Sequence, residues 1–188
     1  VITTRELGRM IREAGIDFNA LEEAEFDSPL GTGTGAAVIF GTTGGVMEAA
    51  LRTVAEVVAG KELPKLEYNE VRGMEQTREA VIDVAGVSVK VAVVHTLKSA
   101  KMMLERIKAG TADYQFIEVM ACPGGCIGGG GQPVPVDASI RQKRREAIFN
   151  CDRTSELRKS HENPEIKTLY DTWLGKPLSE KAHSLLHT

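Results

Sequence analysis

The segment from residue 118 to residue 133, EVMACPGGCIGGGGQP, most constrains the fold, because six of the eight residues from Gly124 to Gly131 are glycine. Such a run destabilises helices and strands, but it lets the backbone adopt positive φ angles and approach a neighbour closely. The segment also carries two thiols, Cys122 and Cys126, and it follows an apolar run, YQFIEVM, that is typical of a buried strand. The sequence therefore predicts a strand that leads directly into a thiol-bearing loop.

The two thiols are candidate ligands. Thiolates bind soft metals and iron–sulfur clusters, and the latter also accept hydrogen bonds from nearby backbone amides. A Cys-x-x-x-Cys pair could equally be two structural thiols or half of a zinc site. The glycine run favours a cluster, because a zinc site needs no such bare backbone around it.

Counting the available ligands indicates that any such site is incomplete. Four-iron clusters and closed zinc sites normally take four protein ligands. Beyond Cys122 and Cys126 the chain has only Cys151, which lies in a charged helical stretch next to Asp152. His95 ends a strand-like run, and the other three histidines lie in the polar C-terminal region. The residues therefore provide half a site.

The remaining pattern predicts an α/β domain. A mixed, largely parallel sheet of about four strands is expected, flanked by helices and followed by a C-terminal helical tail, all in one domain of residues 1–188. Strands are predicted at 66–73, at 114–120, and on both sides of a turn at Ala85–Gly86 within 79–96. Helices are predicted at 3–15, 46–58, 97–107, 138–153, 164–174 and 179–187, and residues 16–31 read as a connection.

Three other motifs are weaker candidates. Gly31, Gly33 and Ala36 match the spacing of a dinucleotide-binding loop, but no strand precedes them. The segment GTTGG at 41–45 precedes a helix, whose free amides favour an anion, although a tight packing loop is the simpler interpretation. The basic residues 141–145 fit a solvated helix face or, alternatively, a docking surface for an acidic redox partner.

Composition excludes several classes. A net charge of −3 argues against nucleic-acid binding, and the longest apolar runs, such as AAVIF, are too short to cross a membrane. Three cysteines, an odd number, fit a reducing interior better than a disulfide framework. No signal segment opens the sequence, so we expect a cytoplasmic protein.

At this point the residues resemble a known family. The segment FIEVMACPGGCIGGGGQP is similar to the last cluster-binding signature of the [FeFe]-hydrogenases, E-x-M-x-C-x-x-G-C-x-x-G-G-G-x-P. The signature falls on Glu118, Met120, Cys122, Cys126 and, at its end, Pro133. The segments GTTGGVMEAALR and LYDTWLGKPLSEKAHSLLHT also resemble this family, so the similarity covers essentially the whole chain.

The resemblance implies specific roles. In the family, the first cysteine of the signature ligates a [4Fe–4S] cubane, and the second bridges the cubane to a di-iron subcluster; together they form the H-cluster. These roles would fall on Cys122 and Cys126, while Met120, Phe40 and Gly41 would line the pocket of the two-iron unit. The implied reaction is the reversible reduction of protons to H2.

The sequence departs from the family in one large respect. The other two signatures, T-S-C-C-P-x-W and M-P-C-x-x-K-x-x-E, are absent. The resemblance therefore implies the C-terminal lobe of the catalytic domain, inactive alone, which needs an N-terminal lobe with the other ligands. Ferredoxin or an NAD(P)-linked subunit would exchange electrons with it. A non-enzymatic iron–sulfur scaffold and a zinc-stabilised binding module remain as alternatives.

Overall fold

The computed structural model describes residues 1–27 and 30–187 of the chain. Its sheet has three strands, β1 (Thr77–Val84), β2 (Val87–His95) and β3 (Phe116–Met120), in the order β1-β2-β3. The first pair is antiparallel and the second is parallel. The turn between β1 and β2 uses Ala85 and Gly86, with φ of 53° and 88°, which matches the twist of a tight hairpin.

The α/β prediction is confirmed, but the number of strands is three rather than four, and only one of the two strand pairs is parallel. The strand predicted at 66–73 is wrong, because this stretch contains a 3₁₀ turn, η3 (Asn69–Val71). Tyr68 and Val71 are both buried. Their separation of three residues suits one helical turn, which directs both side chains into the same core.

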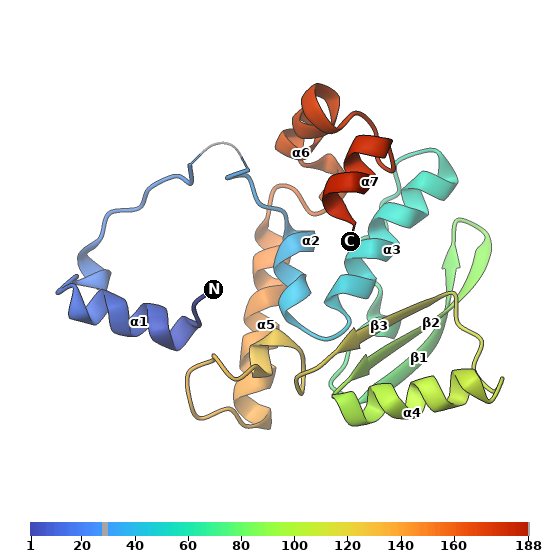
Figure 1. Ribbon diagram of the computed structural model, residues 1–188, viewed down its shortest axis with the longest axis horizontal. Helices are drawn as coiled ribbons and strands as arrows, with labels where there is room; N and C mark the ends of the chain where they lie inside the picture. Colours follow the sequence, from blue (N-terminus) through green and yellow to red (C-terminus); the bar gives the residue numbers. More distant parts are fainter. Residues whose placement is uncertain (28–29, 188) are drawn as a thin grey trace.

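Helices cover the two faces of the sheet (Figure 1). α3 (Gly45–Ala59) packs on one face, where Met47 and Leu51 meet Ile82 and Val91. α4 (Leu97–Lys108) packs on the other face through Met103. The remaining helices are α1 (Thr4–Glu13), α2 (Gly35–Val38), α5 (Ala138–Thr154), α6 (Pro164–Leu169) and α7 (Glu180–Leu186); η2 (Ile39–Gly41) and a π-helical segment, η6 (Tyr170–Leu174), are shorter.

The apolar spacing within 46–58 predicts one buried stripe along α3, and only its first half is buried. Met47 and Leu51 are buried as this spacing predicts, whereas Val54, Val57 and Val58 are exposed. Instead the helix buries two charged side chains, Glu48 and Arg52. A burial prediction based on apolar residues alone misses this face, because its charges are neutralised by partners distant in the sequence.

Those partners join α3 to α5. Arg52 Nη1 lies 2.7 Å from Asp152 Oδ1, and Arg52 Nη2 lies 2.6 Å from Glu48 Oε1. Arg72 and Arg158 extend the network to Glu48 and to Asp152. Burial alone would lower the pKa of Arg52, but its hydrogen bonds to Asp152 and Glu48 outweigh burial and raise it. Arg52 therefore stays charged, and the network ties α5 to α3 and to the sheet on which α3 packs.

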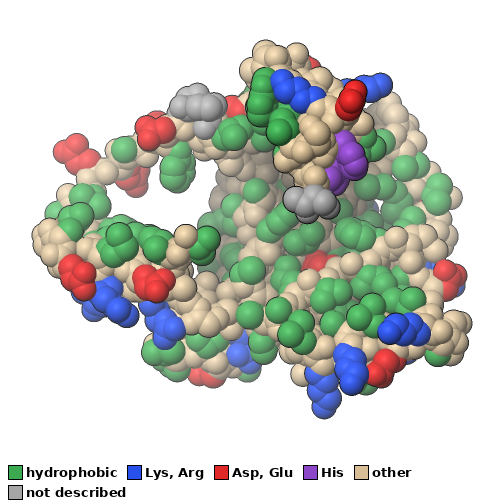
Figure 2. Space-filling view, in the orientation of Figure 1, with side chains coloured by type: hydrophobic (Ala, Val, Ile, Leu, Met, Phe, Trp, Pro, Cys, Tyr) green, Lys and Arg blue, Asp and Glu red, His purple; other side chains and the backbone are tan. Residues whose placement is uncertain are grey.

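α1 lies apart from this body (Figure 1). The helix predicted at 3–15 is confirmed, and Thr3 is its N-cap. None of its ten residues is buried by the described part of the chain, and Leu7 and Met10 are 46% and 53% exposed. Hydrophobic side chains gather along one side of this region (Figure 2). The predicted connection that follows is exposed where it is described, and residues 28–29 lie outside the described residues.

Among the described residues, no helix combines the length and the apolar character that crossing a bilayer requires.

Candidate functional site

The predicted thiol-bearing loop follows β3 directly. Gly124 and Gly125 take φ of 81° and 93°, which are left-handed values that favour glycine, and a 3₁₀ turn, η4, spans Cys126–Gly128. Cys122 is half-buried and Cys126 is exposed. β3 itself is an edge strand and is less buried than its sequence predicts, since Phe116 and Val119 are exposed.

The loop packs against backbone that a side chain would displace. A Cβ atom on Gly125 would lie 2.7 Å from Met120 Sδ and 2.8 Å from the Thr43 nitrogen. The Thr43 amide donates a hydrogen bond of 3.0 Å to the Gly124 carbonyl. The structure therefore brings Met120 and the segment before α3 against the cysteine loop, and it explains why glycine is needed there.

Phe40 and Gly41 belong to the same neighbourhood. They lie in η2, which packs against η4, the turn that begins at Cys126. Phe40 is 46% exposed, whereas Gly41 faces α5, since a Cβ there would lie 2.9 Å from Ile148 Cδ1. Close packing against α5 therefore explains why residue 41 is glycine. The exposed ring of Phe40 forms an apolar surface near the loop.

Glu118 anchors the loop to α3. Its carboxylate accepts hydrogen bonds from the amides of Gly44, at 2.6 Å, and Met47, at 2.8 Å, at the N-terminus of α3. Burial raises the pKa of Glu118, and the two amide bonds oppose that shift. The free amides at the GTTGG turn therefore bind this carboxylate, which fixes the strand that leads to Cys122 to the N-terminus of α3.

His95 is a neighbour of the loop that sequence reasoning missed. It is buried, its Nδ1 accepts from the Gly124 amide at 3.4 Å, and its Nε2 lies 3.1 Å from the Met74 carbonyl. Because Nδ1 is the acceptor, Nε2 carries the hydrogen. The register of the parallel pair places His95 beside Met120, and the spacing of residues along the chain does not reveal this register. Both ring nitrogens are used, so His95 supports the loop rather than binding metal.

The basic residues of α5 face the chain itself. Arg144 donates to the carbonyls of Ile127 and Pro133, both at 2.8 Å, and Arg141 donates to Val136 at 3.2 Å. Arg145 stacks over the Phe149 ring at 5.1 Å, and Lys143 is exposed. The interpretation of this run as a free docking surface is therefore wrong for Arg141 and Arg144, whose guanidinium groups are hydrogen-bonded within the chain, and Arg145 lies over the Phe149 ring.

The dinucleotide interpretation fails on its context, as expected. The described residues around Gly31 and Gly33 form no strand, and Thr34 caps a helix of only four residues. Gly35 lies against Asp152 of α5. The small residues of this segment therefore serve packing.

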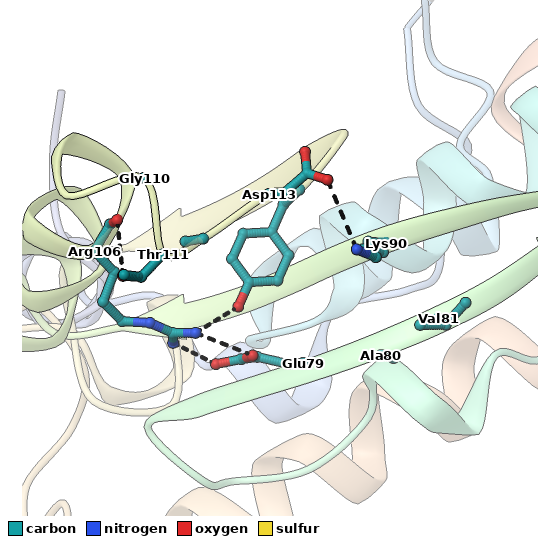
Figure 3. Close-up of a pocket in the computed structure, with 10 residues that line it drawn as sticks. Glu79, Ala80, Val81, Lys90, Arg106, Gly110, Thr111 and Asp113 are labelled. Atoms are coloured by element: carbon teal, nitrogen blue, oxygen red, sulfur yellow. Dashed lines mark hydrogen bonds and ion pairs between the residues drawn. The ribbon is translucent and has the colours of Figure 1, made fainter.

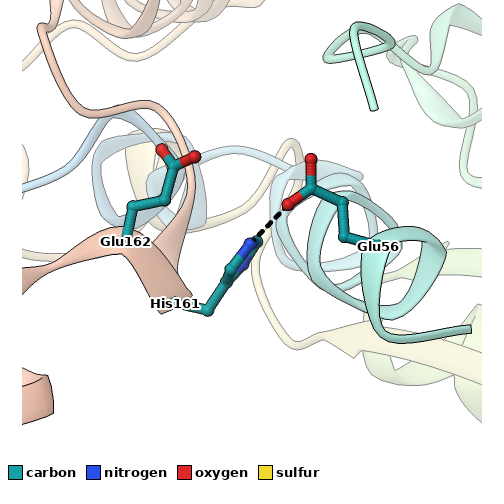
Figure 4. A group of neighbouring side chains, drawn as sticks. All are labelled: Glu56, His161 and Glu162. Carbon is teal, nitrogen blue, oxygen red and sulfur yellow. Dashed lines mark hydrogen bonds and ion pairs between the residues drawn. The ribbon is translucent and has the colours of Figure 1, made fainter. Parts of the chain in front are cut away.

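A second group of possible metal ligands contains Glu56, His161 and Glu162 (Figure 4). His161 Nε2 lies 2.7 Å from Glu56, and its Nδ1 lies 3.0 Å from the Thr53 hydroxyl. The buried Lys159 ammonium already lies 2.8 Å from Glu56 and 3.0 Å from Glu162. This ammonium supplies the positive charge that a metal ion would bring, so the group forms an ion-pair network.

A cavity of about 470 Å³ lies between β1, β2 and the end of α4 (Figure 3). Its charged side chains satisfy one another: Arg106 pairs with Glu79 and bonds the Tyr114 hydroxyl, and Lys90 pairs with Asp113. Its lining includes none of the cysteine loop. It offers no unpaired group with which to hold a charged ligand.

The cysteine loop, in contrast, fits an iron–sulfur group. A Cβ on Gly129 would lie 3.1 Å from the Cys126 carbonyl oxygen and 3.9 Å from Cys122 Sγ, which is an ordinary contact distance. A Cβ on Gly130 would meet nothing within 4 Å, so bare backbone lies beside the two thiols. Within the described ranges, no group of three metal-ligating side chains includes Cys122 or Cys126, and Cys151 is an exposed thiol on α5. Two soft donors and bare backbone suit part of a cluster site, which further ligands must complete.

Two sequence models match the chain. Residues 1–130 match the iron only hydrogenase large subunit, C-terminal domain, and residues 138–188 match the iron hydrogenase small subunit. The chain belongs to the iron-only hydrogenase family. It corresponds to a C-terminal region of these proteins.

The relatives that match this chain include two hydrogenase subunits and the protein NAR1. The NADP-reducing hydrogenase subunit HndD of Solidesulfovibrio fructosivorans is 50% identical over all of this chain and 32% of its own length. The periplasmic [Fe] hydrogenase large subunit of Nitratidesulfovibrio vulgaris is 54% identical over 71% of this chain and 32% of its own length. Protein NAR1 of Arabidopsis thaliana is 32% identical over the whole chain and 41% of its own length. The chain therefore spans about a third of the length of the two hydrogenase subunits.

A solved structure shares the fold. The structure of HydA(deltaEFG), which reveals stepwise assembly of the [FeFe]-hydrogenase H-cluster, matches with a TM-score of 0.78 and 47% identity. The match covers all of this chain and 55% of that one.

Proposed function

We propose that this chain is the C-terminal lobe of the catalytic domain of an [FeFe]-hydrogenase, and that it supplies two of the four thiolates that hold the H-cluster. One observation carries the proposal: Cys122 and Cys126 lie on a glycine loop that packs on Met120 and on the segment before α3. Residues 1–188 act as a single domain in this proposal, which the buried ion pairs between α3 and α5 support.

Each residue has a proposed role toward this group. Cys122 would ligate the [4Fe–4S] cubane, and Cys126 would be the thiolate that the cubane shares with the di-iron subcluster. Met120, Phe40 and Gly41 would line the pocket of the di-iron unit and exclude water from it. When bound, the group supplies the redox chemistry that interconverts protons and H2. Glu118 fixes the strand before the loop to the N-terminus of α3. His95, at the end of β2, accepts a hydrogen bond from the loop itself.

The proposal includes partners. An N-terminal lobe contributes the remaining cluster ligands, and ferredoxin or an NAD(P)-linked subunit exchanges the electrons; the name of the relative HndD, an NADP-reducing subunit, supports the second choice. We place the protein in the cytoplasm because its three cysteines are free. The periplasmic relative makes cell fractionation the direct check of this compartment.

A non-enzymatic iron–sulfur assembly protein is the second candidate. The relative NAR1, and the cytosolic iron-sulfur assembly component 3 of Bos taurus at 29% identity, each match over the whole chain. The two hydrogenase subunits are more similar, at 50% and 54% identity, which favours the enzyme.

Hydrogen production separates the two candidates. The complete polypeptide, loaded anaerobically with the H-cluster, should evolve H2 from reduced methyl viologen, and Cys126→Ser should abolish this activity while Cys151→Ser leaves it unchanged. A polypeptide that binds iron and sulfide but evolves no H2 under these conditions would favour the assembly protein. The 188-residue chain alone should show neither activity nor a stable four-iron EPR signal.

A further inference from the structure

The cysteine loop has almost no side chains with which to fix its own shape. From Gly128 to Gly131 every residue is glycine, and glycine loses more conformational entropy on ordering than any other residue. Inside the loop, the Cys126 carbonyl accepts from the Gly129 amide at 3.0 Å and from the Gln132 side chain at 3.2 Å. These bonds close the loop on itself but do not tie it to the body of the protein.

Two arginines from outside the loop bond to it: Arg5 of α1 bonds the Gly130 carbonyl, and Arg144 reaches both ends of the glycine run. Arg144, in the middle of α5, donates from Nη1 to the Ile127 carbonyl and from Nη2 to the Pro133 carbonyl, each at 2.8 Å. The first acceptor comes directly after Cys126, and the second comes after the glycine run. A guanidinium is suited to this task because its donors are held in a rigid plane and stay charged.

Arg141, one turn earlier on α5, reinforces the contact. Its Cδ would lie 3.0 Å from a Cβ on Gly128 and 3.2 Å from a Cβ on Gly124. α5 therefore lies along the loop and leaves the thiol side open, since Cys126 remains exposed. Moreover, α5 belongs to the segment that matches the small-subunit model, whereas the cysteines belong to the large-subunit segment.

We infer that Arg144 is a positioning residue for the cluster site: it clamps both ends of the glycine run and holds Cys126 where a bridging thiolate is needed. The inference rests on the proposed function for its purpose. It gives the small-subunit segment a direct part in shaping the site, beyond covering the surface of the large-subunit segment.

Amide hydrogen exchange tests the clamp without any iron. In the complete polypeptide purified without metal, Arg144→Gln should raise the exchange rate of residues 126–132 by about tenfold, the effect of losing a charge-assisted hydrogen bond on a local opening. Amides of β2 and of the rest of α5 should be unchanged. Lys143→Gln removes the same charge from the neighbouring exposed position and should change nothing.

Two further readouts sharpen the test. Arg144→Lys keeps the charge but loses the two-pronged donor, so it should recover less than half of the protection; this milder variant also carries the test if Arg144→Gln does not fold. Alkylation of Cys126 should become faster in both variants relative to alkylation of Cys151. After loading, these variants should hold less iron and show a broadened cluster EPR signal.

Unchanged exchange over 126–132 in Arg144→Gln would overturn the inference. So would full recovery in Arg144→Lys, or an equal rise throughout α5 and the sheet, because Arg144 would then act by charge or by general stability. If the unsubstituted polypeptide took up no iron, the proposed function would fall, while the exchange result would still decide the role of Arg144.

Discussion

Two helices of the chain, α5 and α1, are held in opposite ways. α5 is joined to α3 by a fully buried ion pair between Arg52 and Asp152, and it also reaches the cysteine loop through Arg144. α1 touches the rest of the described chain at the glycine loop, where Arg5 bonds the carbonyls of Gly130 and Gly131. Both helices are well capped, so local sequence signals alone do not distinguish them.

The difference concerns what each helix needs from its surroundings. The buried charges of α3 and α5 are satisfied within the chain, so these elements form a self-sufficient core. The apolar side of α1, with Leu7 and Met10 exposed, is not satisfied by the described residues. This contrast agrees with a proposed N-terminal lobe that adds both apolar contacts and cluster ligands.

The largest effect on stability is predicted for the buried ion pair between α3 and α5. Asp152→Ala should lower the free energy of unfolding by about 3–5 kcal/mol, because it leaves Arg52 buried and without one of its carboxylate partners. Urea denaturation followed by circular dichroism measures this loss. Arg12→Ala, on exposed α1, is the control and should change the stability by less than about 0.5 kcal/mol. Equal effects of the two substitutions would remove the contrast.

The next effect is at the site. Gly125→Ala should cost about 1–3 kcal/mol, because its Cβ would press on Met120 and Thr43 and its φ of 93° is strained for alanine. Gly130→Ala, where a Cβ meets nothing within 4 Å, is the matched control and should cost little. Thermal unfolding of both variants gives the comparison, and a tolerated Gly125→Ala would mean that the loop packs differently.

These cases show what sequence can predict. The hairpin at Ala85–Gly86 and the loop after β3 follow from local rules, since turn residues and glycine determine the backbone there. The buried face of α3 does not, because Glu48 and Arg52 are burial-compatible only with partners up to a hundred residues away. Likewise His95 reaches the loop through sheet register, which spacing along the chain does not reveal.

A smaller effect depends on pH. The Leu63 amide and Lys159 lower the pKa of Glu56 to about 2 from its ordinary 4.5. A lowered carboxylate pKa gives stability that is fully present above pH 4.5 and is lost as the pH falls toward 2. Denaturation midpoints measured across this range should fall more steeply for the unsubstituted chain than for Glu56→Gln. Parallel curves would show that the Lys159 network contributes nothing.

The smallest effect on the stability of the isolated chain is expected in α1. Met10→Ser on the isolated chain should change the free energy of unfolding by less than about 0.5 kcal/mol, because the side chain is already exposed. In the complete polypeptide the same change should destabilise by more, since the N-terminal lobe would bury this side of α1. Equal, negligible effects in both contexts would argue that no lobe packs there.

The most direct test of the central claim is the iron and acid-labile sulfide content of the complete polypeptide after anaerobic reconstitution. The account predicts that Cys122→Ser sharply reduces the iron retained after gel filtration and removes the four-iron EPR signal, while Cys151→Ser keeps both. Undiminished iron and an unchanged signal in Cys122→Ser would contradict it.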